Sequence, residues 1–522
     1  MMRNAETGEA MPTETELKLR LDAAGMRRLR RHRLIARLKR ARPTTRFMKS
    51  VYFDTPDFRL YDLQMVLRVR HLGRRRLQTI KDMGEMIGGV RARGEWESEI
   101  TGDTPEIGQI GDETVPPQFA DARLWRALQP VFTSEIRRTV YHLSDEDWEI
   151  ELALDEGLIT TSQDSIPVCE AELELKRGQP KHLFDLALAL QRDLPFIIET
   201  ATKAGRGYDL LTGRKRQHYK ADPLKLAATL SAAEAFRLIA HSCLAHFLAN
   251  YANLDGGPGA ETIHQMRVAL RRLRSAIGIF KDFLDTAESR WLKEELRWLL
   301  TPLGAARDGD VFFDEIFAPL TGILDDEPGF HLLQQDLTAE RRAAYTAAQE
   351  LLKTPRLTHL LLRLGRWIEA GDWQEAEGAE RRSLLDMPIR DLAETTLNKL
   401  ERKAGRGMRH LSEDDETGRH TTRIHIKKLR YSIDFFESLF RGIKSRKLVE
   451  HLGALQDRLG LLHDIAVGRQ RLARHGETAQ DSGRLWAAGM IAGWHLARVD
   501  DLVKQSIKDW RRFDKQARPW KR

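Results

Sequence analysis

The stretch Thr13–Leu21, TETELKLRL, alternates charged and apolar side chains along its length. Glu14, Glu16, Lys18 and Arg20 occupy every second position, and leucines fill the positions between the last three. Residues two apart share one face of a β-strand. The stretch therefore predicts a strand with an apolar face and a face that mixes acids with bases.

The same alternation continues to about Gly213, in LRVRHLG, RLQTIKD, RARGEWESEI, IRRTVYHL, WEIELALDEG and CEAELELKRG. Turn-forming Gly, Pro and Asp residues separate these segments, which is typical of an antiparallel sheet. Apolar residues recur every three or four positions at Ala23–Arg40, Ala120–Leu128 and Lys181–Leu194, so we expect helices there.

The charged faces of these strands form one set, and each opposite face is largely apolar. Besides the first strand, the set contains Arg68, Arg70, Thr79, Lys81, Arg91, Arg93, Glu95, Glu97, Glu99, Glu149, Glu151, Asp155, Glu170, Glu172, Glu174 and Lys176. The simplest interpretation is a sheet with one face in water. However, carboxylates about 6.7 Å apart repel by roughly 2.5 kcal/mol at an effective dielectric near 20, and in a confined lumen cations must relieve this repulsion.

A closed barrel with this inner face would hold a polyanion and metal together. Arg and Lys pair with phosphate oxygens, and clustered Glu side chains bind Mg²⁺ or Mn²⁺, which prefer oxygen ligands. Phosphoryl transfer depends largely on positioning and charge neutralisation, so this mixture suits a triphosphate.

The second half of the chain has a different pattern. From about Ser231 the apolar period becomes 3.6, which predicts helices throughout. HQMRVALRRLR at His264–Arg274 matches HTTRIHIKKLR at His420–Arg430 with an offset of 156 residues. LGAARDGDV, from Leu303, matches LGLLHDIAV, from Leu459, with the same offset, which indicates a duplicated helical unit.

Each copy of the repeat has a basic stripe on one side of its helix. On a helical wheel Arg267, Arg271 and Arg274 lie within about 80° of His264, and apolar residues occupy the opposite side. His420, Arg423, Lys427 and Arg430 form the stripe of the second copy. A solvated face is the plain alternative, but two symmetric stripes would line a shared groove for a polyanion. Nucleic acid is the rival ligand, although no recognisable nucleic-acid-binding motif accompanies the stripes.

Bulk properties narrow the protein class. A chain of 522 residues with 41% hydrophobic and 31% charged side chains predicts a globular protein of two to four domains. No apolar run is long enough to span a bilayer, and the polar start MMRNAETGEAM does not resemble a signal peptide. Two cysteines, with no metal-binding spacing, fit a reducing cytoplasm. The net charge of +8 points to a polyanionic partner.

The motifs of the first half resemble those of the CYTH, or triphosphate tunnel metalloenzyme, family. They are ETELKL, YFDT, LRVR, TIK, RGEWE, ALDEG, CEAELELK and TKAGRGY, which appear over residues 12–214. The resemblance implies an α+β domain with an eight-stranded antiparallel tunnel. It implies metal ligands Glu14, Glu16, Glu172 and Glu174, with Lys18, Arg68, Arg70, Lys81, Arg138 and Lys203 on the phosphates and Glu95, Glu97 and Asp155 completing the site. Arg137 is the alternative to Arg138, and Thr202 stands where the family has Ser.

The second half, after a linker at 215–230, resembles the CHAD domain over residues 231–517, and its two basic motifs and LG patches are the hallmarks. The resemblance implies two pseudo-symmetric four-helix bundles that bind inorganic polyphosphate. The implied ligands are His264, Arg267, Arg271, Arg272, Arg274, His420, Arg423, Lys427, Lys428 and Arg430. Arg307 is a further candidate, and His463 replaces it in the second copy.

Together these resemblances imply an inorganic triphosphatase that uses Mg²⁺ or Mn²⁺ and binds tripolyphosphate and polyphosphate. Two alternatives remain open: an adenylate cyclase acting on ATP in the same tunnel, and a non-catalytic polyphosphate-binding or granule-targeting protein. We expect a cytoplasmic protein, with polyphosphate granules as one location, no membrane association and no nucleic-acid partner. Chain-length preference, the choice of metal, oligomeric state and coupling between the domains are not predicted.

Overall fold

The computed structural model describes residues 13–82, 85–87, 90–107, 116–213, 218–253, 259–375, 378–440, 446–478 and 482–521. The side chains of 13, 14, 85–87, 90–93, 446 and 476–478 lie outside the description. The described residues fall into two compact units. One comprises 1–219, 248–257 and 353–370, and the other comprises the rest of the chain.

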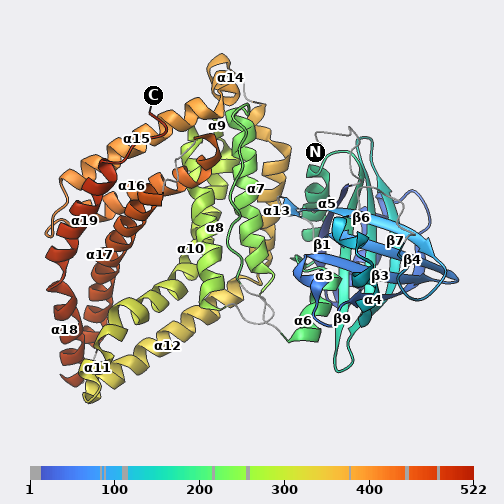
Figure 1. Ribbon diagram of the computed structural model, residues 1–522, viewed down its shortest axis with the longest axis horizontal. Coiled ribbons are helices and arrows are strands. Elements are labelled where there is room, and N and C mark those ends of the chain that lie inside the picture. The colour runs from blue at the N-terminus through green and yellow to red at the C-terminus, as the bar shows by residue number, and fades with distance from the viewer. Residues whose placement is uncertain are drawn as a thin grey trace. The chain divides into compact units, whose positions relative to one another are not determined.

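The first unit is built on an antiparallel sheet of ten strands (Figure 1). The strands are β1 (Thr13–Arg20), β2 (Thr44–Asp54), β3 (Met65–Leu72), β4 (Arg75–Asp82), β5 (Glu85–Ile87), β6 (Val90–Ile100), β7 (Gln129–Ser144), β8 (Glu149–Thr160), β9 (Ser165–Arg177) and β10 (Ile197–Ile198). Their order is β10-β1-β9-β8-β7-β2-β3-β4-β6-β5.

Strand β1 also pairs with β6, over the four residue pairs from Thr13↔Gly94 to Glu16↔Arg91. Eight strands therefore follow one another in a ring that is joined at β1 over this short stretch. The predicted antiparallel sheet is confirmed, and the short strands β5 and β10 are additions to the eight expected.

The two faces of the strands differ as the alternating sequence predicts. Leu17, Leu19, Leu67 and Val69 are at most 1% exposed, whereas their neighbours on β1 and β3 carry the charges. Short helices cover parts of the apolar outer face: α3 (Arg59–Asp62) and α4 (Ala122–Ala127) cover a cluster around Leu67, and α5 (Lys181–Gln191) packs on β1 and β9.

The segment predicted to be helical, Ala23–Arg40, forms two helices. These are α1 (Ala23–Arg30) and α2 (Arg33–Leu38). The break falls at His32, whose backbone is extended and whose Nδ1 accepts a hydrogen bond from the amide of Leu34 at 3.3 Å. The His32 side chain caps the start of α2 and satisfies a backbone donor that a continuous helix would use internally, so the apolar period did not reveal the break.

Helix α6 (Lys203–Thr212) packs against β7, β8 and β9. Gly207 lies against the ring of Phe132, where a Cβ atom would approach Cε2 to 2.2 Å. Tyr208 donates a hydrogen bond to Asp54 at 2.7 Å and joins a buried cluster that includes Tyr52 and Phe132. Part of the inward face is therefore apolar, and the charged side chains occupy the remainder.

The second unit is helical. Its helices are α7 (Ala232–Tyr251, ending in the first unit's range), α8 (Ala260–Ile279), α9 (Lys281–Leu284), α10 (Ala287–Val311), α11 (Thr321–Leu324), α12 (Pro328–Leu351), α14 (Ala379–Asp386), α15 (Ile389–Arg409), α16 (Glu416–Phe435), α17 (Arg446–Thr478), α18 (Ser482–Leu496) and α19 (Val499–Asp514). Helix α13 (Pro355–Ala370) falls in the first unit, where it packs beside α5. The mixed α+β class with a C-terminal helical region is confirmed (Figure 1).

The sequence repeat maps onto equivalent pairs of packed helices. His264 lies on α8 and Leu303 on α10, whereas their counterparts His420 and Leu459 lie on α16 and α17. Among the residues that the structure describes, no helix combines the length and the apolar character needed to cross a bilayer.

Candidate functional site

The charged face of the sheet brings together side chains from distant parts of the sequence. Strand register places Arg68 opposite Thr79, and Thr79 opposite Glu97, on β3, β4 and β6. Elsewhere in the ring, Arg138 stands opposite Asp155, which stands opposite Glu170. Directly opposite residues share a face, so these groups point to the same side of the sheet.

Lys203, at the start of α6, lies among three buried carboxylates. Its Nζ is 2.6 Å from Asp155 and 3.0 Å from Glu172, and it also donates to Glu170. Oxygen atoms of these carboxylates lie within 4.8 Å of one another. Burial alone would lower the pKa of Lys203, but the three negative charges raise it above the ordinary value. The ammonium group therefore supplies the cation that this acidic cluster requires.

Arg138 and Lys18 bind the same cluster from two other strands. Arg138 forms two hydrogen bonds with Asp155, at 2.7 and 2.6 Å, and a third with Glu172. Lys18 donates to Glu172 and lies 3.2 Å from Glu16. Burial would raise the pKa of Glu172, but the charges of Lys18, Lys203 and Arg138 hold it well below the ordinary value. Glu172, a predicted metal ligand, is thus engaged by three cations of the chain itself.

Arg68 and Arg70 have much less compensation. The guanidinium of Arg68 approaches Glu95 only to 3.8 Å, and its Nε has no hydrogen-bond partner among the described residues. Arg70 donates to the Ser50 hydroxyl at 3.4 Å. Burial, together with the charges of Arg68 and Arg138, lowers the pKa of Arg70 to about 9. Two half-buried guanidinium groups on one strand face could pair with an anion.

Lys81, Glu95 and Glu97 lie on the strands next to this arginine pair, β4 and β6. Lys81 contacts Glu95 at 2.7 Å, and both lie on the charged face. Glu97 is exposed and accepts a hydrogen bond from Thr79 at 3.3 Å. All three positions agree with the predicted face, although their roles in a reaction remain predictions.

A row of carboxylates on β1, β9 and β8 fits a divalent metal. Glu16 stands opposite Glu174, and Glu174 stands opposite Glu151. Glu16 is only 2% exposed. Like charges directly opposite each other repel, and oxygen donors are the ligands that Mg²⁺ and Mn²⁺ prefer. The predicted ligand Glu14 precedes this row on β1, and its side chain lies outside the described residues.

The structure separates some alternatives that the sequence left open. Arg137 lies on the outer face, is 57% exposed and pairs with Glu156 at 3.0 Å, so Arg138 is the inward residue. Thr202 caps α6 by accepting a hydrogen bond from the amide of Gly205 at 2.9 Å, which explains why a hydroxyl suffices there. Glu170 and Arg206, paired at 2.5 Å, belong to the buried cluster, but the sequence motifs did not single them out as site residues.

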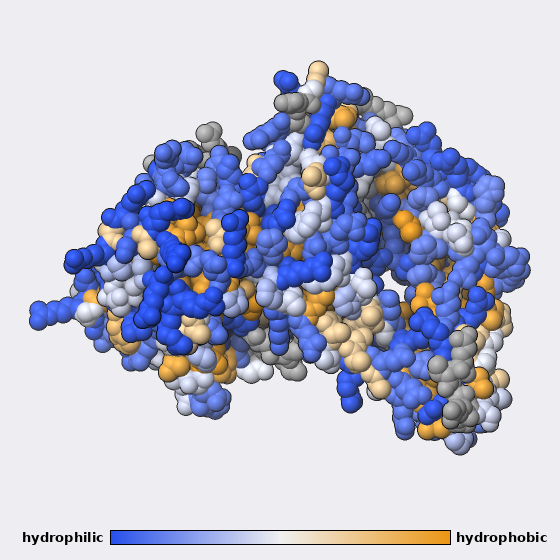
Figure 2. Space-filling model, turned by 180° about the vertical axis from the view of Figure 1, so that it is seen from behind, coloured by the Kyte–Doolittle hydropathy of each residue, from blue (hydrophilic) through white to orange (hydrophobic). Residues whose placement is uncertain are grey.

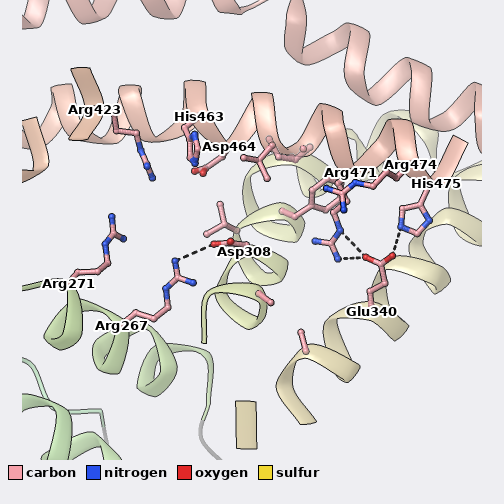
Figure 3. A pocket seen from close by; sticks show the side chains of 17 residues that line it. Arg267, Arg271, Asp308, Glu340, Arg423, His463, Asp464, Arg471, Arg474 and His475 are labelled. Atoms are coloured by element: carbon pink, nitrogen blue, oxygen red, sulfur yellow. Dashed lines mark hydrogen bonds and ion pairs between the residues drawn. The ribbon is translucent and has the colours of Figure 1, made fainter. Parts of the chain in front are cut away.

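The helical unit encloses a second charged site. A cavity of about 610 Å³ is lined by side chains from α8, α10, α12, α16 and α17 (Figure 3). Arg267 and Arg271 lie on one side of it, and Arg423, His463 and Asp464 lie on the other. Arg267 is 3.3 Å from Asp308. The two copies of the repeat thus contribute residues at equivalent positions to the lining: Arg267 and Asp308 from the first copy, Arg423 and Asp464 from the second.

Three of the ten predicted polyphosphate ligands line this cavity: Arg267, Arg271 and Arg423. Lys427 follows Arg423, which lines the cavity, by about one turn of α16. Burial and the charges of Arg271 and Arg423 lower the pKa of Lys427 to about 6. Arg272 is buried with its guanidinium 5.5 Å from the Phe435 ring, which indicates a packing role. The other predicted residues, which do not line the cavity, are His264, Arg274, His420, Lys428 and Arg430.

The cavity also contains charges that the sequence motifs missed. Glu340 of α12 accepts hydrogen bonds from Arg471, at 3.0 and 2.7 Å, and lies 2.7 Å from His475 (Figure 3). Arg471 and His475 follow Asp464 by two and three turns of α17, so the helical period places them on one side of that helix. Extending the helical wheel beyond the repeated motif would have found them.

The two predicted histidines occupy equivalent settings. His420 Nδ1 is 3.3 Å from His463 Nδ1. Burial, together with the charge of Arg307, lowers the pKa of His264. Arg307 and His463 occupy equivalent repeat positions, so each faces the histidine of its own copy. Burial and nearby charges lower the pKa of His463 to about 4.

Comparison with known families agrees with this division. Residues 12–208 match the CYTH domain model, and residues 238–473 match the CHAD domain model. The chain is a CYTH domain followed by a CHAD domain. The CYTH domain contains the ring of charged strands and most of α6, whereas the CHAD domain contains both copies of the helical repeat.

Similar proteins cover only parts of the chain. An inorganic triphosphatase of Haemophilus influenzae is 32% identical over 173 residues, which are 33% of this chain and 47% of that protein. An uncharacterised protein of Mycobacterium tuberculosis is 23% identical over 267 residues, 49% of each chain. The chain thus spans about half the length of these curated relatives. The crystal structure of the CHAD domain from Ricinus communis is 29% identical, covers 56% of this chain and 96% of its own, and has a TM-score of 0.48.

Proposed function

We propose that the CYTH domain hydrolyses inorganic tripolyphosphate and short polyphosphate with Mg²⁺ or Mn²⁺, and that the CHAD domain binds long-chain polyphosphate. The observation that carries the first part is the half-buried pair Arg68 and Arg70, whose recognised carboxylate contact among the described residues is the long 3.8 Å approach of Arg68 to Glu95. The cations around Glu172, by contrast, each have a close acidic partner. A phosphate chain would give the two arginines the negative charge that the protein does not provide.

The metal would be held by Glu16 and Glu174, with Glu14 beside them on β1. A bound divalent cation supplies charge neutralisation on the phosphate oxygens and polarises the phosphorus. The chain's own groups perform the rest of the proposed work. Arg68, Arg70 and Lys81 orient the phosphates, while Lys18, Arg138 and Lys203 keep the surrounding carboxylates ionised and in place.

The 32% identity to an inorganic triphosphatase supports this reaction for the CYTH domain. A requirement for metal also fits a domain whose charged face contains a row of opposed carboxylates. The cavity with Arg267, Arg271 and Arg423 supports polyphosphate binding by the CHAD domain, because it collects basic side chains from both copies of the repeat.

The enzyme proposal is tested by phosphate release from tripolyphosphate, ATP, thiamine triphosphate and long-chain polyphosphate, with and without Mn²⁺. We expect tripolyphosphate to be the best substrate and activity to disappear in EDTA. Glu16→Gln keeps the shape of the side chain and removes one oxygen donor, so we expect at least a tenfold loss that higher metal concentration partly restores. The control Glu149→Gln alters an exposed carboxylate on β8 and should leave turnover unchanged.

Folded protein that releases no phosphate from tripolyphosphate with either metal would contradict the enzyme proposal. Cyclic AMP formed from ATP would instead identify an adenylate cyclase. Binding of tripolyphosphate without turnover would favour a non-catalytic polyphosphate protein.

The CHAD proposal is tested by competition. Long-chain polyphosphate should displace labelled polyphosphate from the full chain, and homopolymeric RNA at equal phosphate concentration should not. Arg271→Ala combined with Arg423→Ala should weaken polyphosphate binding by at least tenfold and leave tripolyphosphate hydrolysis intact. Equal competition by RNA would indicate a general polyanion site.

A further inference from the structure

The positive charge of the chain is concentrated in residues 23–53. This segment contains eleven Arg and Lys residues and no Asp or Glu, between Asp22 and Asp54. The whole chain has 85 basic and 77 acidic residues, so the remainder has 74 basic residues against the same 77 acidic ones. The net charge of +8 therefore arises from a segment that forms α1, α2 and most of β2.

Seven of these eleven cations form what we call the α1–α2 basic patch: Arg27, Arg31, Arg33, Arg37, Lys39, Arg42 and Arg46. All seven are exposed, and none has a carboxylate partner among the described residues. The other four are engaged: Arg30 with Glu156, Lys49 with Glu135, Arg28 with the Asp193 carbonyl and Arg40 with Ser144.

Fold stability does not account for this arrangement. Met26, Leu29, Ile35 and Leu38 are at most 6% exposed and anchor both helices, so the apolar side chains secure the segment without the cations. Basic residues in the last turn of α1 suit the helix dipole. Arg33, however, is the first residue of α2, where a positive charge is unfavourable. Concentrated like charge also costs self-repulsion.

The α1–α2 basic patch extends onto β2, one of the strands that form the ring of the CYTH domain. Arg46 of β2 stands opposite Arg138 of β7, and the neighbouring hydroxyls of Thr45 and Thr139 are 3.0 Å apart. The Arg138 side chain binds the buried carboxylates, whereas Arg46 is exposed. A linear anion lying along α1 and α2 would thus reach the ring of strands at β2.

We propose that the α1–α2 basic patch is a second binding site for long-chain inorganic polyphosphate, located on the CYTH domain itself. Only the identity of the ligand rests on the proposed function. The surface suits a polyanion without bases or acyl chains. This surface includes one exposed aromatic ring, Phe47, which is 63% exposed and gives little surface for stacking of nucleic-acid bases. The apolar side chains of both helices point into the protein, so they are not available to insert into a bilayer.

The test compares two triple variants of the full chain, both made with Arg271→Ala and Arg423→Ala to weaken the cavity of the CHAD domain. The first combines Arg27→Gln, Arg33→Gln and Arg37→Gln. The matched control combines Arg74→Gln, Arg126→Gln and Arg192→Gln, which removes three exposed cations of the same unit outside the patch. Binding of labelled long-chain polyphosphate is measured directly, by fluorescence anisotropy across a range of salt concentrations.

We expect the patch variant to bind long-chain polyphosphate at least tenfold more weakly than the control. The slope of log affinity against log salt should decrease by about 2, because three phosphate contacts release about that many counter-ions from a flexible chain. Tripolyphosphate turnover should be equal in both variants, because the substituted residues Arg27, Arg33 and Arg37 lie on α1 and α2, outside the strands that carry the charged face.

Equal polyphosphate affinity and equal salt slopes in the two variants would overturn the proposal. Selective loss of binding to homopolymeric RNA, or to phosphatidylserine vesicles, with polyphosphate binding unchanged would also overturn it, and would assign the patch to that ligand. Binding is measured without turnover, so an inactive parent protein would contradict the proposed enzyme while leaving this test intact.

Discussion

At the scale of single residues, Arg70 is a group that lowers the stability of the empty protein and would favour the binding of an anion. Its guanidinium is half-buried beside Arg68 and donates a long hydrogen bond to the Ser50 hydroxyl. Burying a charge without a partner is costly, and a neighbouring like charge adds to the cost. A bound phosphate chain would remove this penalty, so the empty protein should be less stable than its apolar side chains allow.

We therefore predict that Arg70→Met raises the melting temperature of the phosphate-free protein by about 2–4 °C, equivalent to about 1 kcal/mol. The same variant should lose most of the stabilisation that tripolyphosphate gives the wild type, because stabilisation by a ligand follows its affinity. Thermal unfolding with and without tripolyphosphate measures both effects.

Arg137→Met is the matched control, because Arg137 belongs to the same sheet but lies exposed on its outer face. It should keep the full ligand-induced shift. An Arg70→Met protein that melts lower than wild type and retains the whole shift would show that Arg70 serves the fold.

The face on which a side chain lies could be predicted from the sequence where the strand period alone determines it. The alternation assigned Lys18, Arg68 and Glu172 to one face, and the register agrees. It left Arg137 and Arg138 open, and the preference for Arg138 came from the family resemblance. The alternation could not show which carboxylates already have cationic partners. Glu172 resembles Glu16 in the sequence, but Lys203 arrives beside it from a helix about thirty residues later, and this depends on the tertiary packing of α6.

At the scale of elements, the close packing of α6 at one glycine sets the positions of several side chains. Gly207 allows the helix to approach Phe132, and this approach sets the positions of Lys203 and Tyr208. Tyr208 reaches Asp54, which also accepts the backbone amides of Leu60 and Tyr61 at 2.8 and 3.0 Å. The helix thus connects the start of α3 with the buried carboxylates.

We predict that Gly207→Ala destabilises the CYTH domain by about 1–3 kcal/mol, because its Cβ would overlap the Phe132 ring. Urea unfolding monitored by tryptophan fluorescence measures this change. Adding Phe132→Leu should recover part of the loss, because it frees space at the point of contact, and the double variant should be more stable than the sum of the single changes implies. Additive losses would place the strain elsewhere.

The sequence largely predicted which segments are strands and which are helices. It predicted the residues at which these elements begin and end less well. Alternation and helical periods distinguished strands from helices in both halves. They missed the interruption at His32, because the apolar pattern of Met26, Leu29, Ile35 and Leu38 continues across it. The TKAGRGY motif was noted as a family mark, but the functions of its glycine and tyrosine emerge only from contacts with Phe132 and Asp54.

At the scale of the whole molecule, the CHAD cavity has charges that respond to pH. Burial and the charge of Arg271 lower the pKa of Lys427 to about 6, and burial raises the pKa of Asp464 to about 6. Near neutral pH the empty cavity thus contains a largely neutral Lys427 beside an ionised Asp464. A bound phosphate chain favours the protonated form of both groups, so binding takes up protons.

We therefore predict that polyphosphate binds more tightly as the pH falls from 8 to 5.5. Both groups contribute above about pH 6, where the empty cavity has lost their protons and a bound phosphate chain favours their return. Below about pH 6 both groups are already protonated, so the dependence levels off. Each group can add up to tenfold in affinity per pH unit. Isothermal titration calorimetry in buffers of different ionisation enthalpy would measure both affinity and proton uptake.

Lys427→Arg keeps the positive charge throughout this range, so it should flatten the dependence above pH 6. Asp464→Asn removes the second titrating group, so it should also reduce the dependence above pH 6. An affinity that is constant over the range, or that increases with pH, would contradict this assignment of the two groups.

The placement of Lys203 limits where the chain can be cut. A fragment that stopped after the last strand, at Ile198, would retain all the strands of the sheet but would lack the shared ammonium group. Asp155, Glu170 and Glu172 would then be left with an excess of buried negative charge. An excised N-terminal piece should therefore extend through Thr212, even though its final residues add nothing to the β-structure.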